Sequence, residues 1–384
     1  MTPQARVQAA IEILDLVIAA ARANGAPADR VVSDWFRTRR FAGSKDRRAV
    51  RELVYSAIRA CGPVPASGRA AMLRVAQDDA AVASLFDGSP HAPTPIVPGE
   101  AIADGGIAPG WLEAALADSG IAGADALALL ARAPLDLRIN TLKADPAALE
   151  LPLAGEPGPA RNSLRLPHGT QIETWDAYTK GQIEVQDAGS QLVCAALAAQ
   201  PGELVIDLCA GAGGKTLGLA AAMDNRGRLI ACDVDRPRLS KLEPRAVRAG
   251  VTIAETRLLN PNRELEALAD LMGQADAVLV DAPCSGTGTW RRNPEARWRL
   301  TPDQLARYVA IQSRLLDLAA RLVRPGGRLG FVTCSLIDAE GAGQASGFLD
   351  RHSDWAADEL MLGAGEVRGP GLRISPARDG TDGF

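Results

Sequence analysis

The chain has 384 residues, more than the roughly 100 to 200 of one ordinary domain, so we expect two or three units that each bury a core. Its formal net charge of -4 excludes a surface that binds nucleic acid over its whole extent, so any contact with nucleic acid must be local. No apolar stretch reaches the ~18 residues of a membrane span, and no secretion leader is recognisable. We therefore expect a cytoplasmic protein that works as a monomer away from membranes.

Six cysteines are scattered along the chain without paired spacing or a CxxC motif, and none of the three histidines lies near them in sequence. In a chain of this size, this pattern favours reduced thiols and disfavours both a disulfide scaffold and a structural zinc site. We expect no bound metal. The cysteines are Cys61, Cys194, Cys209, Cys232, Cys284 and Cys334.

Two helical patterns occupy the beginning of the chain. Apolar residues recur at helical spacing over residues 5–23, and the pattern stops at Gly25 and Pro27. A second pattern covers residues 44–58, where Ser44 could cap the helix. Residues 1–90 are therefore predicted to form a small helical bundle.

Positive side chains alternate with aromatic ones over residues 35–48. Such a segment can neutralise phosphates and stack on bases, which favours an RNA contact, although a solvated basic face over core aromatics has the same composition. The predicted RNA-binding residues here are Arg37, Arg39, Arg40, Lys45, Arg47 and Arg48.

Three further regions follow. Proline and glycine crowd residues 91–110, which predicts a linker or long loop. A helical pattern over 111–132 and strand-like alternation over 134–142 predict a small α+β segment for residues 111–185. From residue 186 to 384, strands, glycine turns and helices alternate, which indicates an α/β fold with a mainly parallel, doubly wound Rossmann-like sheet.

A glycine-rich turn follows the short apolar strand predicted at residues 204–208. Glycines let backbone N–H groups approach a ligand, and a helix N-terminus favours an anion there. A P-loop would need glycine at Cys209, and a dinucleotide fingerprint would need glycine or alanine at Thr216, so both of these motifs fail. The predicted cofactor-binding loop is Cys209, Ala210, Gly211, Ala212, Gly213, Gly214 and Lys215.

Asp233 follows the next predicted strand, residues 229–232, about 20 residues beyond the turn. An acid at this distance accepts hydrogen bonds from ribose hydroxyls, although Asp233 could instead cap the helix near Pro237. The turn at residues 322–329 looks like the corresponding turn of S-adenosylmethionine-dependent methyltransferases. That resemblance favours S-adenosylmethionine over NAD as the cofactor.

Two cysteines follow neighbouring strands of the predicted sheet. One strand, residues 277–280, leads to Asp281 and Cys284, and another, residues 329–333, leads to Cys334. Because ligands bind beyond the carboxyl ends of strands in such sheets, these three side chains should converge. A lone cysteine is more often a small buried hydrophobe, but two at equivalent strand ends favour a chemical role.

Methylation at C5 of cytosine would explain a cysteine pair. C5 is too weak a nucleophile to attack a methyl sulfonium, but addition of a thiolate at C6 makes the ring enamine-like. One cysteine would add to C6, and the other could assist proton removal and release. Asp281 could hydrogen-bond N3 and the exocyclic amine of the base.

Several motifs together resemble the Sun/Nop family of RNA cytosine-C5 methyltransferases, and more closely its bacterial branch that acts on small-subunit ribosomal RNA. The resemblance covers nearly the whole chain, and residues 1–90 look like the NusB-like RNA-binding domain of bacterial members. The matching motifs are Asp207-Leu208-Cys209-Ala210, Gly213-Gly214-Lys215-Thr216, Asp281-Ala282-Pro283-Cys284-Ser285-Gly286-Thr287-Gly288, Arg291-Arg292-Asn293-Pro294 and Thr333-Cys334-Ser335.

The resemblance implies a role for each matching residue. The cysteine after threonine, Cys334, would be the nucleophile, Cys284 would assist release, and Asp281 would bind the base close to the methyl donor. The loop from Cys209 to Lys215 and Asp233 would bind the cofactor. Four arginines are implied to approach RNA, with a solvated basic loop as the alternative: Arg291, Arg292, Arg297 and Arg299.

The chain departs from the family pattern at four places. Ala212 replaces the usual proline, and Asn260 stands where an acid often contacts the adenine amine, a bond that an amide can still accept. The stretch after Ser335, residues 338–342, is poorer in acidic and amide residues than is usual. The sequence stops at Phe384, where family members continue into a last strand, so a longer native chain is expected.

The sequence therefore predicts an RNA cytosine-C5 methyltransferase with ribosomal RNA as its substrate. Two other enzymes remain open: a transfer-RNA methyltransferase, and a DNA cytosine-C5 methyltransferase that uses Cys284 as its nucleophile. A third alternative is a ribosome-assembly factor that senses the cofactor without catalysis.

Overall fold

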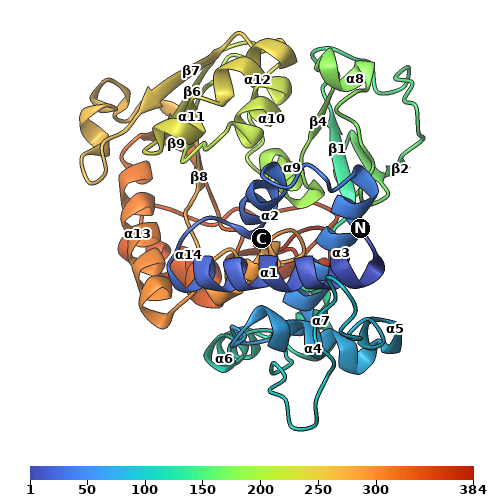
Figure 1. Cartoon of the computed structure of the whole chain (residues 1–384). Coiled ribbons are helices and arrows are strands. Elements are labelled where there is room, and N and C mark those ends of the chain that lie inside the picture. Colours follow the sequence, from blue (N-terminus) through green and yellow to red (C-terminus); the bar gives the residue numbers. More distant parts are fainter. The chain divides into compact units, whose positions relative to one another are not determined.

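The computed structural model describes residues 1–384, which form two compact units. Unit 1 consists of Met1–Ala131 and Thr289–Pro302, and unit 2 of Arg132–Gly288 and Asp303–Phe384. This division differs from the predicted domains, because residues 91–131 belong to the helical unit and a short segment after the Cys284 loop returns to it (Figure 1).

Unit 1 is helical, as predicted for its first 90 residues, but it has more helices than the two expected. One hydrophobic core joins the first five of them and Trp298, with α1 contributing Ile13, Leu14 and Val17, all fully buried. Gly43, not Ser44, precedes α3, so Ser44 is the first helical residue and does not cap. The helices are α1 (Pro3–Arg22), α2 (Ala28–Arg37), α3 (Ser44–Ala60), α4 (Gly68–Asp78), α5 (Ala80–Ala83), α6 (Gly110–Asp118), α7 (Gly123–Ala128) and the 3-10 turn η4 (Pro294–Trp298).

Two predictions about residues 91–132 are corrected by unit 1. Residues 91–109 have no helix or strand, but they are not a free linker: Gly62 N–H donates to the carbonyl of Asp104, and Ala103 N–H donates to that of Ala70. The single helix expected over 111–132 is two helices, because Gly120 takes φ +82 and ends α6.

Unit 2 begins with a small antiparallel sheet in the order β2-β3-β1-β4. The strand predicted over 134–142 is β1, and its alternation turns Leu135 and Leu137 towards the hydrophobic core of this sheet. Asp136 receives two hydrogen bonds from Arg165 and one from the N–H of Ala188, which joins the sheet to the start of α9. The elements are β1 (Leu135–Ile139), β2 (Glu156–Pro157), β3 (Ser163–Leu166), α8 (Asp176–Thr179) and β4 (Ile183–Val185).

The rest of unit 2 is a five-stranded, fully parallel sheet in the order β7-β6-β5-β8-β9. This is the predicted doubly wound fold, with the first strand (β5) beside the fourth (β8) and the fourth beside the fifth. The strands are β5 (Leu204–Leu208), β6 (Arg228–Asp233), β7 (Ala254–Leu258), β8 (Ala275–Asp281) and β9 (Val323–Val332).

Helices cover both faces of the parallel sheet (Figure 1). Val205 and Leu279 pack against α9 and α10, whereas Ile206 and Val278 pack against α13, so neighbouring residues of one strand face opposite layers. The helices are α9 (Ala188–Ala196), α10 (Gly214–Ala222), α11 (Arg236–Leu239), α12 (Leu242–Ala249), α13 (Pro302–Ala320) and α14 (Ala342–Arg351).

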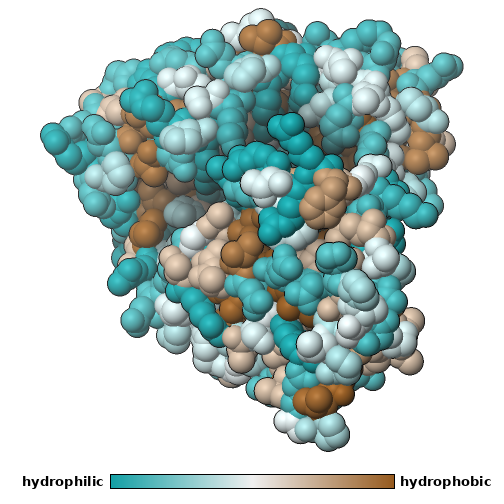
Figure 2. All heavy atoms as spheres, viewed as in Figure 1, coloured by the Kyte–Doolittle hydropathy of each residue, from teal (hydrophilic) through white to brown (hydrophobic).

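The last residues form the hairpin β10 (Glu366–Arg368) and β11 (Gly371–Arg373), followed by α15 (Pro376–Asp379). The remaining 3-10 turns are η1 (Glu264–Glu266), η2 (Ala269–Leu271), η3 (Thr287–Thr289) and η5 (Asp338–Glu340). None of the helices combines the length and the hydropathy needed to cross a membrane. Hydrophilic side chains predominate on the face shown in Figure 2, and hydrophobic ones lie between them in small groups.

Candidate active site

The predicted site residues of unit 2 follow the carboxyl ends of the parallel strands, all at one edge of the sheet. Cys209 follows β5, Asp233 ends β6, Asn260 follows β7, Asp281 ends β8 and Cys334 follows β9. Parallel pairing brings these ends together, which is why residues far apart in sequence form one site.

The loop after β5 has the backbone that a close ligand approach requires. Cys209 takes φ +75, a left-handed conformation that is uncommon outside glycine, and Ala210 N–H donates to the carbonyl of Cys232 at 2.7 Å. Gly213 takes φ +82, and a Cβ there would lie 2.0 Å from a methyl carbon of Leu242. Only glycine fits that position, where the loop enters α10.

Asp233 holds this loop in place. Its carboxylate accepts the N–H of Gly211 at 2.7 Å and the N–H of Asp235 at 2.7 Å, and the side chain is 5% exposed. The neighbouring Asp235, and not Asp233, caps α11, since its side chain accepts the N–H of Arg238. Each carboxylate oxygen has a second lone pair, so Asp233 can still accept from a ligand.

Asp207 is a fully buried acid within β5, behind the loop. One of its oxygens accepts the Thr216 hydroxyl at 2.6 Å, and the other has no hydrogen-bond partner. Burial raises the pKa of Asp207 to about 6, with a smaller upward contribution from the nearby charge of Asp281. A buried acceptor without a partner suits a ligand that brings an N–H group.

Lys215 in the first turn of α10 binds Asp281 at the end of β8, with 2.7 Å between Nζ and Oδ2. Burial acts to lower the pKa of Lys215, but the Asp281 carboxylate outweighs it and holds the pKa above its usual range. This ion pair joins the predicted cofactor loop to the strand end that leads to Cys284.

The two cysteines predicted to share one reaction lie together, with 3.3 Å between the Sγ atoms of Cys284 and Cys334. This is a hydrogen-bond distance between free thiols and is longer than a disulfide bond. The hydrogen bond to Cys334 raises the pKa of the Cys284 thiol well above its usual range, and burial adds to this effect. Cys284 therefore favours its protonated form.

Sequence reasoning missed one member of the site, Glu340. It lies in the stretch described above as poor in acidic residues, is fully buried, and accepts hydrogen bonds from Ser285 and Ser335. The only sequence signal was an acid shortly after the Thr-Cys-Ser motif. Asn260 is exposed, and its side chain makes no contact that assigns it a role.

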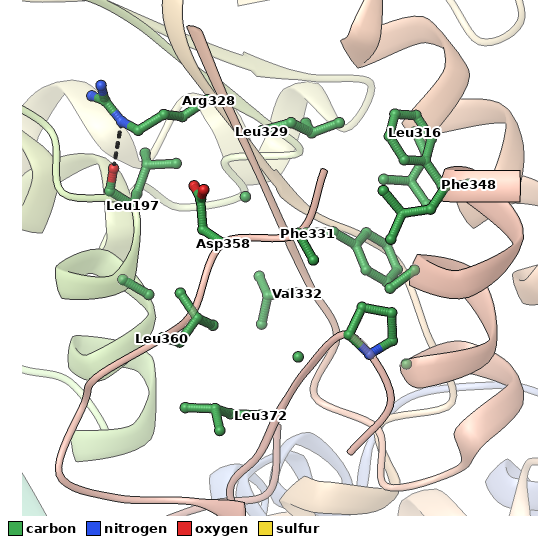
Figure 3. A pocket seen from close by; sticks show the side chains of 18 of the residues that line it. Leu197, Leu316, Arg328, Leu329, Phe331, Val332, Phe348, Asp358, Leu360 and Leu372 are labelled. Atoms are coloured by element: carbon green, nitrogen blue, oxygen red, sulfur yellow. Dashed lines mark hydrogen bonds between the residues drawn. The ribbon is translucent and has the colours of Figure 1, made fainter. Parts of the chain in front are cut away.

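A cavity of about 750 Å³ in unit 2 lies along the edge strand β9 (Figure 3). Leu329 and Phe331 of the edge strand β9 line it together with Phe348 of α14 and Leu360. Neither cysteine and no residue of the glycine loop belongs to its lining. The lining does include Thr333 and Ser335, the chain neighbours of Cys334, so the cavity borders the candidate active site.

The basic residues of unit 1 fall into two groups. Arg40, Lys45 and Arg48 are exposed, as an RNA contact requires. Arg37, Arg39 and Arg47 also make contacts within the unit: Arg37 pairs with Asp34, Arg39 lies 4.0 Å from the centre of the Trp35 ring, and Arg47 donates to the Ala42 carbonyl.

The arginines after Gly288 correct the expectation that all four approach RNA. Arg297 is fully buried and donates to the carbonyls of Ile58 and Cys61. Arg299 donates to the carbonyls of Gly25 and Ala26, so both side chains stabilise unit 1 internally. Arg291 is 7% exposed, and Arg292 and Arg299 are partly accessible.

Comparisons with known proteins agree with this architecture. Residues 194–384 match the family model described as 16S rRNA methyltransferase RsmB/F. Ribosomal RNA small subunit methyltransferase B of Xanthomonas campestris is 34% identical over 293 residues, covering 74% of this chain and 66% of that protein. The protein of the same name from Erwinia tasmaniensis is 34% identical over 223 residues, covering 58% of this chain and 50% of that protein. The chain thus spans between half and two thirds of the length of these relatives.

Two solved structures extend the comparison. PH0851 covers 100% of this chain and 98% of its own, with a TM-score of 0.76 and 25% identity. NSun6 from Pyrococcus horikoshii, solved with SFG, covers 56% of this chain and 54% of its own, with a TM-score of 0.51 and 26% identity.

Proposed function

The chain belongs to the RsmB/F family of methyltransferases, and we propose that it transfers a methyl group from S-adenosylmethionine to C5 of a cytosine in small-subunit ribosomal RNA, through a covalent adduct on Cys334. The observation that carries this proposal is the pair of thiols 3.3 Å apart at the carboxyl edge of the sheet. A methyl donor alone needs no such pair, whereas addition to and release from cytosine C6 needs both a nucleophile and a proton carrier.

The residues around the glycine loop fit S-adenosylmethionine. The unpartnered oxygen of Asp207 suits an ammonium group, and the N-terminus of α10 suits a carboxylate. Asp233 would accept from ribose hydroxyls, and Asn260 from the adenine amine. When bound, this cofactor supplies a methyl group carried on a sulfonium. SFG, the molecule solved with NSun6, is an analogue of it.

The proposed methyl transfer takes place in two steps, formation of an adduct on Cys334 and its release. In the proposed reaction, the Cys334 thiolate forms a bond to cytosine C6, and the electron pair of the C5–C6 double bond shifts towards N3. Asp281 accepts a hydrogen bond from the exocyclic amine, and a proton from the Lys215–Asp281 pair passes to N3 and neutralises its charge. C5 then takes the methyl group, which leaves the demethylated cofactor as a thioether. The C5 proton passes to water, its electron pair restores the C5–C6 double bond, the C6–S bond breaks to free the Cys334 thiolate, and N3 returns its proton to the pair.

The assignment of Cys334 as the nucleophile rests on the resemblance of its Thr-Cys motif to that of the Sun/Nop family, and the raised pKa of Cys284 agrees with it. The raised pKa of Cys284 keeps it protonated, so it can donate a hydrogen bond to a Cys334 thiolate and later assist the proton transfers. The positive charge of Lys215 also interacts with the charge of Cys334. A DNA-type mechanism would need the opposite assignment, with Cys284 ionised.

The exposed basic residues of unit 1 are proposed to bind the RNA. Arg40, Lys45 and Arg48 can neutralise phosphates, and Phe41 beside Arg40 is 72% exposed, which suits stacking on a base. The predicted cytoplasmic location and monomeric state stay predictions.

A substrate comparison tests the function. The protein is incubated with labelled S-adenosylmethionine and unmethylated small-subunit ribosomal RNA, transfer RNA or DNA, and the digested nucleosides are separated by mass spectrometry. We expect label in 5-methylcytidine from the ribosomal RNA. Label in transfer RNA or DNA instead would show that this nucleic acid, and not ribosomal RNA, is the substrate. Cofactor binding without any transfer would favour a non-catalytic assembly factor.

A further inference from the structure

A buried carboxylate, that of Glu340, lies where the loops carrying the two cysteines meet. One oxygen accepts the backbone N–H of Ser285 at 2.9 Å and the amide of Gln312 at 3.0 Å. The other accepts the hydroxyl of Ser335 at 2.6 Å and that of Ser285. Four donors converge on a side chain with no exposed surface, and no cation pairs with it.

Each serine is the chain neighbour of a cysteine. Ser285 follows Cys284, and Ser335 follows Cys334, so the carboxylate connects the backbone at one thiol to the backbone at the other. Two further bonds join the same loops: Thr287 accepts the N–H of Leu336 at 2.8 Å, and Gly288 N–H donates to the carbonyl of Cys334 at 3.0 Å.

We propose that Glu340 is a positioning residue, whose carboxylate ties the Cys284 loop to the Cys334 loop and holds the two thiols at the separation that the methyl transfer requires. The proposal rests on the proposed function for its catalytic meaning, but the tie itself is a property of the free protein. Neither loop has regular secondary structure at its cysteine, so packing alone does not set the distance between the two sulfur atoms.

The tie matters because both thiols must reach one base. Cys334 must add to C6, and a proton carrier must act on the same ring within hydrogen-bond reach, so a displacement of about 1 Å can cost on the order of a hundredfold in rate. The charge of Glu340 also contributes to the raised pKa of Cys284, after the hydrogen bond to Cys334 and burial. Tyr308 and Lys215 are further titratable groups that interact with these thiols.

The separation of the thiols can be measured without RNA or cofactor. Diamide oxidises two neighbouring thiols to a disulfide and is itself reduced to a hydrazine, which takes up both protons. The rate at which the Cys284–Cys334 disulfide forms, followed by peptide mass mapping, reports how often the two sulfur atoms are within reach.

Glu340→Ala removes the tie, and the double variant Ser285→Ala with Ser335→Ala removes both hydroxyls while Glu340 stays. Glu340→Ala is expected to slow disulfide formation by about tenfold, and the double serine variant, which keeps the bond from the backbone N–H of residue 285 to Glu340, by about threefold. Glu340→Gln keeps the length of the side chain, and a serine hydroxyl can accept from its amide, so a smaller loss of about threefold is expected. The matched control is Glu264→Gln: Glu264 is also a buried acid of unit 2, but its partner is Arg314.

A folded Glu340→Ala protein, with the wild-type thermal midpoint, that forms the disulfide at the wild-type rate overturns the proposal. If Glu340→Ala does not fold, the double serine variant decides in the same way. In the methylation assay the same variants should lower kcat with little change in the KM for RNA. If the variants form the disulfide more slowly but even the wild-type protein transfers no methyl group, the positioning role of Glu340 is supported and the proposed function is wrong.

Discussion

The carboxyl edge of the parallel sheet and the basic segment of residues 35–48 hold their functional side chains in opposite ways. At the sheet edge, Lys215 and Asp281 bind each other, and the two cysteines are in contact. In the basic segment, Arg40 and Lys45 extend into solvent. Covalent chemistry requires fixed distances, whereas phosphate neutralisation requires charge and reach. A substitution in either region should therefore affect only the function of that region.

The largest effect is expected from Cys334→Ala. Loss of the nucleophile should lower the rate of methyl transfer by roughly a thousandfold or more and abolish adduct formation. Initial rates with labelled cofactor and denaturant-resistant RNA complexes measure both. Cys61→Ala, in the core of unit 1, is the control and should retain transfer. Activity in Cys334→Ala would refute its role.

Cys284→Ala should uncouple the two halves of the reaction. The adduct can still form on Cys334, but its release loses the proton carrier, so turnover should fall by about a hundredfold while the covalent complex accumulates. Gel separation under denaturing conditions measures the complex. A Cys284→Ala protein that forms no adduct would show that Cys284, and not Cys334, is the nucleophile.

Arg297→Ala tests whether a buried arginine of unit 1 contributes more to stability than an exposed one. The buried guanidinium satisfies the carbonyls of Ile58 and Cys61, so its loss should lower the free energy of unfolding by about 3 kcal/mol. Arg40→Ala should change it by less than about 0.5 kcal/mol. Urea denaturation measures both variants, and equal values would show that burial does not separate these arginines.

The sheet edge should show a pH dependence from Asp207. Its folded pKa of about 6 is above the ordinary value of an aspartic acid, so the fold favours the protonated acid, and this contribution is present at low pH and lost as pH rises through about 6. Relative to Asp207→Asn, wild type should gain about 2 kcal/mol of stability between pH 7.5 and 4.5. A constant difference across this range would contradict the raised pKa.

The smallest effect concerns the RNA surface. The triple variant Arg40→Ala, Lys45→Ala and Arg48→Ala should weaken RNA binding by about tenfold at low salt and reduce its salt dependence, without loss of stability. The control removes equal charge from unit 2 at three exposed arginines that form ion pairs: Arg226, Arg228 and Arg263. Equal weakening by the control would indicate nonspecific attraction.

The sheet edge could be predicted from the sequence because its rules are local. A short apolar strand followed by a glycine turn placed Cys209 to Lys215, and Asp281, Cys284 and Cys334 each follow a strand. Since parallel strands share an edge, their convergence followed from strand order alone. The alternation of β1 was recognised in the same way.

Contacts between distant segments could not be predicted. Glu340 is hydrogen-bonded to Ser285, which lies 55 residues away in the sequence, and no pattern in either segment predicts this contact. The charge of Arg297 suggested an exposed side chain. In the structure it is buried, because it donates hydrogen bonds to the carbonyls of Ile58 and Cys61 at the end of α3. The break between α6 and α7 did have a local signal in Gly120, which ends a helix where a left-handed residue is needed.

The central claim is that Cys334 forms the covalent bond to the RNA base. RNA in which the target cytosine carries fluorine at C5 traps the adduct, because no proton can leave after methylation, and mass spectrometry of the digested complex identifies the modified cysteine. The account predicts the cross-link on Cys334 in both wild type and Cys284→Ala. A cross-link on Cys284 would contradict it.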